Sequence, residues 1–390
     1  MYSIKQLYIF FLSIYMICLP LGALNIGSIG SLLKIISIFP IFFGLLKMRQ
    51  IRRNFLVTNY FLFAVLSLCS VVWSIYQSNT ITRSISLLQL TVLLSTACAF
   101  DFTEQDVYKI KKSMIWSSRI TLVLLFVAGG LYEGRLTLSG IIHEDPNYLC
   151  MYFVFGAVSC IERLFTNQKA SRLFGIIELV AYTYAILLTG SRGGLLAVLI
   201  SVVLMIIFAG RNDQESPKNT FKRIFIICAA AFAFYWVMWG LTTDLAERYT
   251  VNAVLANGGT GRIEIWTSGI DLYFNQANLF RQVFGYGSAT IAHAFADYGY
   301  RRASLMHNLF LENLLELGLI GFIQYLVMIV AFLKHSFQFK NKYSFCIIVA
   351  FVIMSLSTSI YAFKPYINAM FFIIMQENTY NFEDKVENQL

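Results

Sequence analysis

Long apolar runs separated by short polar turns repeat along most of the chain. A membrane-spanning helix needs about 20 mostly apolar residues. The pattern predicts such spans at residues 6–24, 29–46, 55–74, 85–100, 113–132, 148–165, 173–189, 194–209, 224–241, 317–333 and 343–362. A last one, 368–376, is short and is expected either to begin earlier or only to re-enter the membrane. We therefore expect an all-α fold, a polytopic transmembrane helix bundle of about 11–12 spans.

The apolar pattern lapses once for much longer than elsewhere, over residues 242–304. Connections of this length are uncommon in compact domains and are usually functional, so the chemistry is expected here. The interruption predicts four parts: an N-terminal transmembrane bundle (1–241), an external, periplasmic loop with short amphipathic helices (242–306), C-terminal transmembrane helices (307–376) and a cytoplasmic tail (377–390).

Lys and Arg are distributed unevenly between alternate turns, which predicts the orientation of the chain. One set of turns holds Lys47, Arg49, Arg52, Arg53, Lys109, Lys111, Lys112, Lys169, Arg172, Arg211, Lys218, Lys222, Arg223, Lys334, Lys340 and Lys342. The alternate short turns hold only Arg83, Arg135, Arg192 and Lys364. Basic turns stay in the cytoplasm. Both ends of the chain are therefore expected inside if the last span crosses, and the long loop outside.

Composition agrees with a membrane protein and excludes several other classes. Hydrophobic residues make up 58% of the chain and charged residues only 13%, against about 25% charged in soluble domains. The net charge of +9 comes from basic residues in short turns, without the basic stripe of a nucleic-acid-binding protein. The positive net charge is therefore explained by the basic cytoplasmic turns of a membrane protein.

The cysteines and the N-terminus carry no further signal. Seven cysteines are scattered inside apolar runs, and this spacing indicates neither a disulfide framework nor a zinc site. The N-terminal run to Leu24 begins with a charge, as in a signal peptide, but a convincing small-residue cleavage site is missing. We expect a retained first helix.

The first candidate for chemistry is the motif Thr-Gly-Ser-Arg-Gly-Gly at 189–194, at an outer boundary between two apolar runs. Gly193 and Gly194 let a ligand approach the backbone, and the next helix is predicted to start there. Its free N–H groups, beside Arg192, would form an anion site. A tight turn whose arginine reaches lipid phosphates explains the same residues equally well.

The second candidate lies in the long loop, at Gly-Gly-Thr-Gly-Arg over 258–262. Ile263, Trp266, Ile270 and Phe274 follow at helical spacing, so Arg262 is again expected at a helix start, with Trp266 near lipid headgroups. A surface helix with a solvated arginine is the alternative. The later Gly-Tyr-Gly at 285–287 predicts a flexible turn.

The third candidate is His307-Asn308, at the outer start of a helix that carries Glu312 and Glu316. A histidine at a helix N-terminus tends to stay neutral, because the helix dipole disfavours the cation. A neutral imidazole can accept a proton from a hydroxyl. The competing interpretation is a structural cap or an interfacial histidine. Either glutamate could be a buried carboxylate near the site or a partner for Arg301 or Arg302.

The fourth candidate is Arg135 with the segment His-Glu-Asp-Pro-Asn over 143–147. Pro146 ends one element and Asn147 can cap the next helix. That structural interpretation leaves Arg135 and Asp145 unexplained. Helix starts with Arg, His or Asp on one face would together suit a lipid phosphate or pyrophosphate at the membrane surface.

These motifs resemble, in order and spacing, the O-antigen ligase and polymerase family of bacterial membrane glycosyltransferases. The resemblance is carried by 145–147 (Asp-Pro-Asn), 189–194, Gly261-Arg262 with Trp266, 285–287, His307-Asn308 with Leu311-Glu312, and 316–321 (Glu-Leu-Gly-Leu-Ile-Gly). It implies a GT-C-like helical fold in the bacterial cytoplasmic membrane, with the active face external. The implied reaction transfers a glycan from undecaprenyl pyrophosphate to an acceptor glycan lipid. It needs no metal or other cofactor.

The resemblance also assigns roles. Arg192 and Arg262 would hold the pyrophosphate, and His307 would orient or deprotonate the acceptor hydroxyl. The predicted substrate-binding residues are Arg135, Asp145, Asn147, Ser191, Gly193, Asn308 and Glu312. A chain-length regulator and a flippase are candidate partners, and nucleic acid is not.

Three alternatives stay open. Polymerisation of repeat units into O-antigen or capsule is favoured over ligation of the finished polysaccharide to lipid A-core, because polymerases are numerous and diverse. A glycan flippase would want polar groups along a path across the bilayer. The charges near spans, namely Lys34, Arg119, Glu162, Arg163 and Glu178, line up in no obvious path. A non-catalytic assembly partner would tolerate changes of the outer Arg and His residues.

Overall fold

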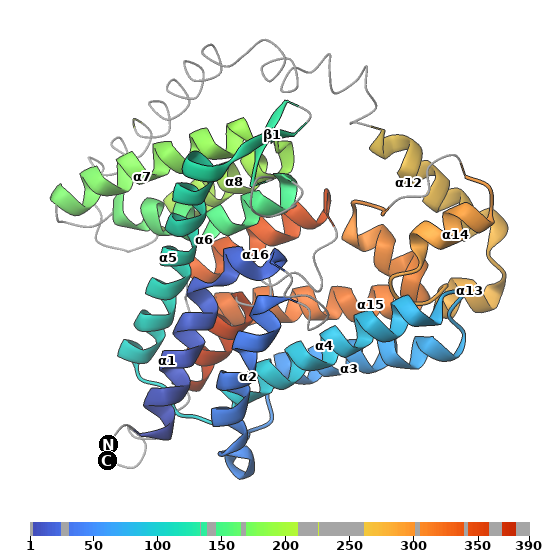
Figure 1. The fold of residues 1–390 in the computed structure, drawn as a ribbon, viewed down its shortest axis with the longest axis horizontal. Helices are drawn as coiled ribbons and strands as arrows, with labels where there is room; N and C mark the ends of the chain where they lie inside the picture. The colour runs from blue at the N-terminus through green and yellow to red at the C-terminus, as the bar shows by residue number, and fades with distance from the viewer. Residues whose placement is uncertain are drawn as a thin grey trace. The chain divides into compact units, whose positions relative to one another are not determined.

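The computed structural model describes residues 3–24, 31–132, 134–138, 146–164, 169–209, 225, 261–300, 305–338, 342–358 and 369–379. These residues are almost all helical. The α-helices are α1 (Ile4–Ile17), α2 (Leu32–Leu45), α3 (Phe55–Cys69), α4 (Gln77–Ala97), α5 (Glu104–Ala128), α6 (Pro146–Leu164), α7 (Lys169–Leu188), α8 (Arg192–Ala209), α12 (Arg262–Asp271), α13 (Leu279–Phe284), α14 (Ile291–Asp297), α15 (Leu309–Gln338) and α16 (Lys342–Ser355) (Figure 1). Short turns of other helix types are η1 (Leu19–Ala23), η3 (Met48–Gln50), η4 (Ser70–Val72) and the π-helical η5 (Leu272–Gln276).

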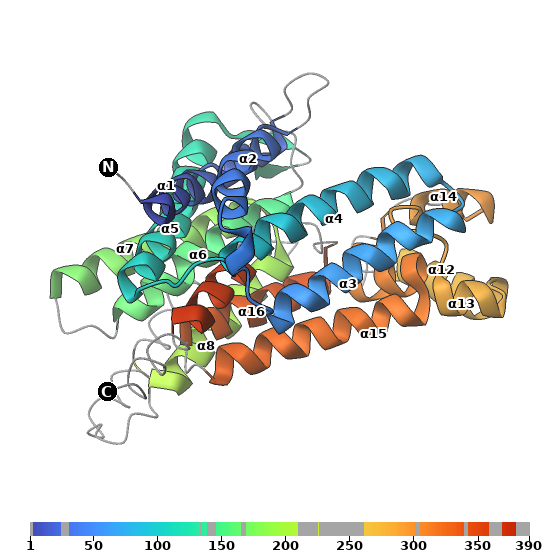
Figure 2. The same cartoon turned by 90° about the horizontal axis from the view of Figure 1, so that it is seen from below.

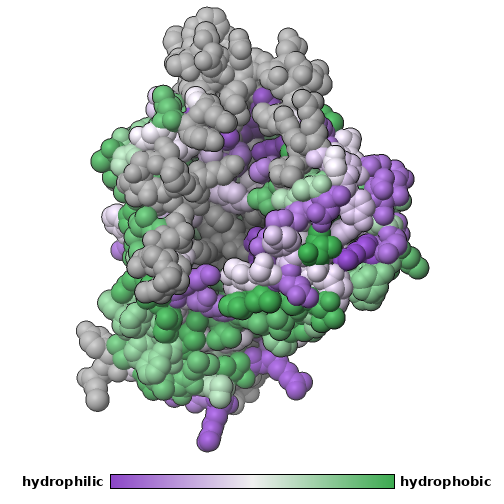
Figure 3. Space-filling model, turned by 45° about the vertical axis from the view of Figure 1, so that its right-hand side comes forward, coloured by the Kyte–Doolittle hydropathy of each residue, from purple (hydrophilic) through white to green (hydrophobic). Residues whose placement is uncertain are grey.

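Among the described residues, three helical segments are long and apolar enough to cross a membrane: Phe55–Val72, Ala170–Leu188 and Leu309–Phe337. Shorter apolar helices fall on four other predicted spans. Many large apolar side chains are exposed, as a lipid phase would require, and Figure 3 shows hydrophobic residues side by side over a broad area of one face. The predicted all-α membrane fold is confirmed, while the number of spans and their orientation stay predictions.

The chain divides into two compact units. Unit 1 comprises Met1–Met114, Thr260–Ser344 and Ser355–Leu390, and unit 2 comprises Ile115–Gly259 and Phe345–Met354. These units cut across the predicted four parts, because α12 to α15 belong to unit 1 together with the first four helices, whereas most of α16 belongs to unit 2.

In unit 1, α3 lies beside α4 and α15 packs along α3, with α12, α13 and α14 gathered at one end (Figures 1 and 2). Buried side-chain bonds join these helices. The amide of Gln324 on α15 donates to the backbone carbonyl of Asn59 on α3, at 3.0 Å. The hydroxyls of Tyr8 on α1 and Thr96 on α4 lie 3.1 Å apart.

In unit 2, α6 is the central element, because nearly every residue from Pro146 to Ile161 is buried. Helix α7 packs closely on it: a Cβ atom at Gly156 would overlap the ring of Tyr182. Phe155 contacts Phe351 of α16 edge-on, with ring centroids 5.8 Å apart. Helix α6 therefore carries most of the core of this unit.

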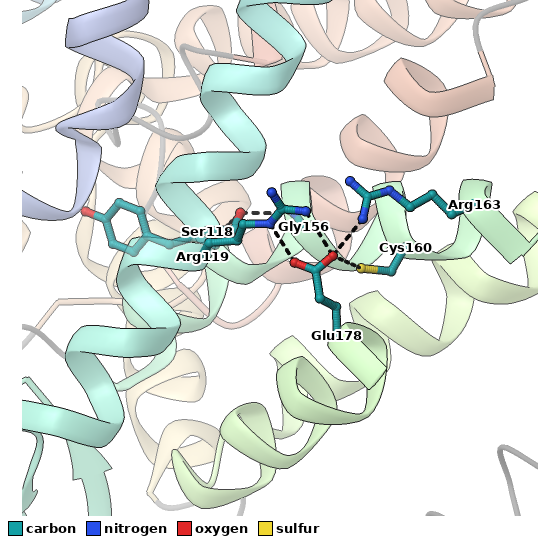
Figure 4. Close-up of polar contacts among 7 residues, drawn as sticks. Ser118, Arg119, Gly156, Cys160, Arg163 and Glu178 are labelled. Carbon is teal, nitrogen blue, oxygen red and sulfur yellow. Dashed lines mark hydrogen bonds and ion pairs between the residues drawn. The ribbon is translucent and has the colours of Figure 1, made fainter. Parts of the chain in front are cut away.

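A charged network joins α5, α6 and α7 (Figure 4). The guanidinium of Arg119 binds the carboxylate of Glu178 through two bonds of 2.6 and 3.1 Å. Arg163 donates to the same carboxylate at 2.8 Å. Three of the charges that were considered for a transport path are thus paired sideways between neighbouring helices. This arrangement favours a structural role for them.

Several predicted boundaries were wrong for identifiable reasons. Helix α4 begins at Gln77, because its polar first turns pack on the loop and need no apolar run. Helix α15 begins at Leu309 and is interrupted at Gly318, which has φ 67° and ψ −166°. Residues 130–132 were predicted as the end of a span but form strand β1 (Gly130–Tyr132), paired antiparallel with β2 (Arg135–Thr137). The predicted span 224–241 lies outside the described residues, except for residue 225.

Replacing Glu178 with Gln should destabilise the protein by roughly 3 kcal/mol, because it leaves two guanidinium groups close together without their shared counter-charge. The measurement is the unfolding midpoint of the purified protein in detergent. Arg52→Ala is the control, since the Arg52–Asp101 ion pair is about two-fifths exposed at each side chain and should contribute at most about 1 kcal/mol. Equal losses in the two variants would contradict a structural role for the network.

Candidate active site

The turn before α8 in unit 2 holds the first set of predicted site residues. Gly190 adopts φ 62°, and the hydroxyl of Ser191 accepts a bond from the N–H of Gly194 at 3.2 Å. Ser191 therefore caps α8, whose first residue is the half-buried Arg192. A Cβ atom at Gly194 would lie 2.7 Å from the Cβ of Cys150, so the helix start is packed closely on α6. The predicted arrangement of an arginine beside a helix N-terminus is present.

Arg135 connects three segments around this turn. Its Nε donates to the carbonyl of Thr189 at 2.7 Å, and its Nη2 donates to the side-chain oxygen of Asn147 at 3.2 Å. The hairpin β1–β2 thus binds the C-terminal end of α7 and the first turn of α6. Arg135 binds both the backbone and the side chain of Asn147, which gives both residues a structural role, and we expect them to position the turn. Asp145 lies outside the described residues.

The second set of site residues is in unit 1. Gly261 adopts φ 79° and precedes α12, whose first residue is the half-buried Arg262. One turn later on the same helix, the indole N–H of Trp266 donates to the carbonyl of Met306 at 2.9 Å. This bond fixes α12 to the residue before His307, and the expected position of Trp266 near the lipid headgroups stays a prediction.

His307 is held in an unusual backbone conformation. It is a non-glycine residue with φ 48°, which costs of order 1 kcal/mol or more and is typical of functional sites. The next residue, Asn308, caps α15 by accepting bonds from the N–H groups of Phe310 and Leu311, at 3.0 and 3.2 Å. The structural role predicted as the alternative for Asn308 is therefore present. His307 itself is half-buried, while Glu312, one turn into α15, is 1% exposed.

A strip of loop backbone, residues 284–289, docks on the interruption of α15. The N–H groups of Tyr286 and Gly287 donate to the carbonyls of Leu315 and Glu316, at 2.9 and 2.8 Å. A Cβ atom at Gly285 would overlap the backbone of Glu316, and one at Gly318 would overlap the backbone of Val283. Both glycines have positive φ, so only glycine fits at either position.

The same docking strip is held from its other side by the turn between α3 and α4. The carbonyls of Phe284 and Tyr286 accept bonds from the Trp73 indole and the Ile75 N–H, both at 3.1 Å. Thr80 donates its hydroxyl to the carbonyl of Ser288 at 2.8 Å. Residues 285–287 were predicted as a flexible turn, but this backbone is bound on two sides and buried. The Trp73–Ile75 turn was missed, since nothing in its sequence indicates a partner some 210 residues away.

Three polar side chains that follow Arg262 in the loop bind one another. The hydroxyl of Tyr300 donates to one carboxylate oxygen of Asp271 at 2.5 Å, and the amide of Asn275 donates to the other at 2.7 Å. The hydrogen bond from Tyr300 is the main reason why the pKa of Asp271 lies below its usual value, and the bond from Asn275 lowers it further. Burial, together with the Asp271 carboxylate, raises the pKa of Tyr300 to about 12.

The described residues therefore form two preorganised sets. One comprises Arg135, Asn147, Ser191, Arg192 and Gly193, and the other comprises Arg262, His307, Asn308 and Glu312. Each set has an arginine as the first residue of a helix. That both sets bind the same ligand stays a prediction. Among the described residues, no group of three or more His, Cys, Asp or Glu side chains is placed to bind a metal.

The fold and these sites define a helical membrane protein with cationic helix starts. Residues 177–326 match the model of the family described as O-Antigen ligase. The matched segment contains the α8 start, the α12 start and the residues before α15, so it includes Arg192, Arg262 and His307. Over this segment, the predicted resemblance to the O-antigen ligase and polymerase family is confirmed. No curated protein matches the chain.

Gly285→Ala and Gly318→Ala should each destabilise the docking strip by at least about 3 kcal/mol, because a methyl group adds backbone overlap to the strain of positive φ. Gly299→Ala is the matched control. Gly299 also has positive φ, but nothing lies within 4 Å of its would-be Cβ, so the expected cost is only about 1 kcal/mol. Limited proteolysis of the loop and the unfolding midpoint measure the effect. Three equal losses would show that the docking contact is unimportant.

Tyr300→Phe should flatten the acid dependence of stability. A carboxyl whose pKa is lowered by folding stabilises the protein above its ordinary pKa and loses that contribution as the pH falls through the lowered value. Wild type should therefore lose more stability than the variant between about pH 6 and about pH 3. Thermal unfolding over this range tests the effect, with the exposed Tyr108→Phe as control. Parallel curves for wild type and Tyr300→Phe would contradict it.

Proposed function

We propose that the protein is a membrane glycosyltransferase that polymerises undecaprenyl-pyrophosphate-linked oligosaccharide repeat units into surface polysaccharide, either O-antigen or capsule. The observation that supports membrane glycan transfer, the part of the proposal that polymerase and ligase share, is the content of the family match. Residues 177–326 include all three predicted catalytic residues, and two of these, Arg192 and Arg262, are the first residues of their helices.

In the proposed mechanism, Arg192 and Arg262 bind the donor pyrophosphate. A guanidinium presents a planar fork of donors that matches phosphate oxygens, and the free N–H groups of a helix start add to the attraction for an anion. Negative charge grows on the pyrophosphate as it leaves. Fixed cations at that position stabilise the transition state more than the ground state and so raise the rate.

His307 is proposed to activate the acceptor hydroxyl. The hydroxyl oxygen attacks the anomeric carbon of the donor sugar and forms the new glycosidic bond, while the bond from that carbon to the pyrophosphate oxygen breaks. The electron pair of the broken bond stays on undecaprenyl pyrophosphate, and the hydroxyl proton passes to the imidazole. The anomeric configuration inverts. A positioned base contributes about 10²–10⁴-fold, and no step needs a metal ion.

The proposed location is the bacterial cytoplasmic membrane, crossed several times, with the long loop and the site on the external face. The count of Lys and Arg in alternate turns supports this orientation. The substrates are then a carrier-linked glycan and an acceptor glycan lipid at the outer surface. A flippase that delivers the donor and a chain-length regulator are the proposed partners.

Ligation is the second candidate, because the matching family model is described as O-Antigen ligase. A ligase would use the same donor, the same pyrophosphate contacts and the same base. Its acceptor would be lipid A-core oligosaccharide, which has no carrier pyrophosphate. The two activities therefore differ in the acceptor only.

Arg192→Ala, Arg262→Ala and His307→Ala should each reduce transfer by at least about 10²-fold while the protein still inserts and folds. Arg192→Lys should also be poor, because a point charge cannot replace the guanidinium fork. The measurement uses protein in nanodiscs with undecaprenyl-pyrophosphate oligosaccharide as donor and acceptor, a metal chelator present, and products resolved by gel.

Arg52→Ala serves as the control for loss of an arginine, because Arg52 is paired to Asp101 and belongs to no site residue set. It should retain wild-type activity. A ladder of lengthening glycans that disappears in the three alanine variants supports the polymerase. Transfer only after lipid A-core is added supports the ligase, and normal ladders from all three variants would refute the site assignment.

A further inference from the structure

Unit 1 contains a cavity of about 410 Å³ that neither residue set occupies. It lies between the start of α2, the first turns of α4 and Tyr15 of α1, and Ala289 at the end of the docking strip borders it. Its volume is within the usual range for small-ligand pockets. By the predicted orientation, the starts of α2 and α4 are both at the outer face, as is the loop that carries Ala289.

The cavity is lined by two cations and by no carboxylate among the described residues. Lys34 comes from α2 and Arg83 from α4. Lys34 lies inside the predicted span 29–46, and Arg83 lies two residues before the predicted span 85–100. An ionisable side chain in the membrane costs free energy, so such residues usually serve a function. Two positive groups around one partly enclosed space attract an anion more strongly than they would in open water.

Hydrogen bonds fix the polar wall of the cavity. The Gln89 amide donates to the Ser37 hydroxyl at 2.9 Å, which joins α4 to α2 next to Lys34. At the other end of the cavity, the amide nitrogen of Asn79 lies 3.0 Å from Nε2 of His293. His293 stacks on Tyr76, with ring centroids 3.8 Å apart. Polar groups that can bind sugar hydroxyls thus stand beside the two cations.

Apart from the hydroxyl-bearing Thr82 and Ser86, the remaining lining is apolar and comes largely from Leu33, Leu90 and Leu93. A site with cations, amides and leucines suits a phosphate group joined to both a hydrocarbon chain and a sugar. Free phosphate would not use the leucines. The lining therefore matches a lipid-linked glycan better than a soluble anion.

We propose that this cavity binds the phosphate of a second membrane lipid, namely the carrier lipid of the acceptor glycan. The proposal rests on the proposed polymerase function, in which donor and acceptor each carry a pyrophosphate. Arg192 and Arg262 serve the donor, whose pyrophosphate leaves, so the acceptor's unreacted pyrophosphate needs a separate anchor. The docking strip supports this assignment: it borders the cavity at Ala289 and binds α15, which begins two residues after His307.

Binding is tested first, without any requirement for catalysis. The protein carries Arg192→Ala and Arg262→Ala to disable the donor contacts, and retention of undecaprenyl monophosphate is measured by native mass spectrometry. Adding Lys34→Ala and Arg83→Ala should weaken retention by at least about tenfold, since each removes a charge-assisted hydrogen bond. Adding Lys112→Ala, an exposed lysine on α5, should change nothing.

Two arms identify the source of the phosphate. Phosphatidylglycerol and inorganic pyrophosphate are offered as competitors at equal concentration. The proposal expects that neither displaces undecaprenyl monophosphate efficiently. Retention that is unchanged by Lys34→Ala and Arg83→Ala would overturn the proposal, and so would efficient displacement by phosphatidylglycerol, which would show an ordinary phospholipid site.

The kinetic test separates this proposal from the proposed function. The polymerase assay is run with two distinct substrates, a carrier-linked polymer as donor and a labelled carrier-linked single repeat unit as acceptor. Lys34→Ala and Arg83→Ala should raise the KM for the acceptor at least about tenfold and leave the KM for the donor unchanged. An equal rise in both would refute an acceptor site. If wild-type protein makes no polymer, the polymerase proposal fails, and the acceptor role fails with it. A positive binding result would then still establish the lipid-phosphate site.

Discussion

The docking of residues 284–289 between two helical elements is the contact on which the described part of unit 1 depends. On one side the strip binds the interruption of α15 at Gly318, and on the other it binds the turn before α4. Because the strip is loop backbone, its unpaired N–H and carbonyl groups would be costly when buried. Hydrogen bonds from both sides satisfy them. The glycines of this strip predict a flexible turn, but the hydrogen bonds fix it to α15 and to the turn before α4.

The same principle operates at the turn before α8. There the backbone carbonyl of Thr189 binds Arg135, and the Ser191 hydroxyl caps the helix that begins at Arg192. In both units a glycine with positive φ precedes a helix whose first residue is an arginine: Gly190 by two residues and Gly261 directly. Each arginine therefore starts from a fixed backbone rather than from a mobile loop. Preorganised charge of this kind is the form of electrostatic stabilisation that costs little reorganisation during a reaction.

Sequence reasoning captured the features that depend on local chemistry. Apolar run length predicted the membrane helices, and the glycine-rich motifs at 189–194 and 258–262 predicted the helix starts beside Arg192 and Arg262. It failed where the partner is distant in the chain. Glu178 sits one helix away from Arg163 and two from Arg119, and no periodicity reveals that three charges in separate helices neutralise one another. Nor does the sequence indicate that the indole N–H of Trp266 binds the carbonyl of Met306, 40 residues away.

The proposed mechanism requires Arg192 and Arg262 to act on one pyrophosphate. The most direct measurement is a double-mutant cycle on the affinity of the detergent-solubilised protein for undecaprenyl pyrophosphate, using Arg192→Ala, Arg262→Ala and the double variant. Groups that share one ligand are expected to show a coupling free energy of about 1 kcal/mol or more. Losses that simply add, within about 0.3 kcal/mol, would mean that the two arginines serve separate sites and would contradict the account.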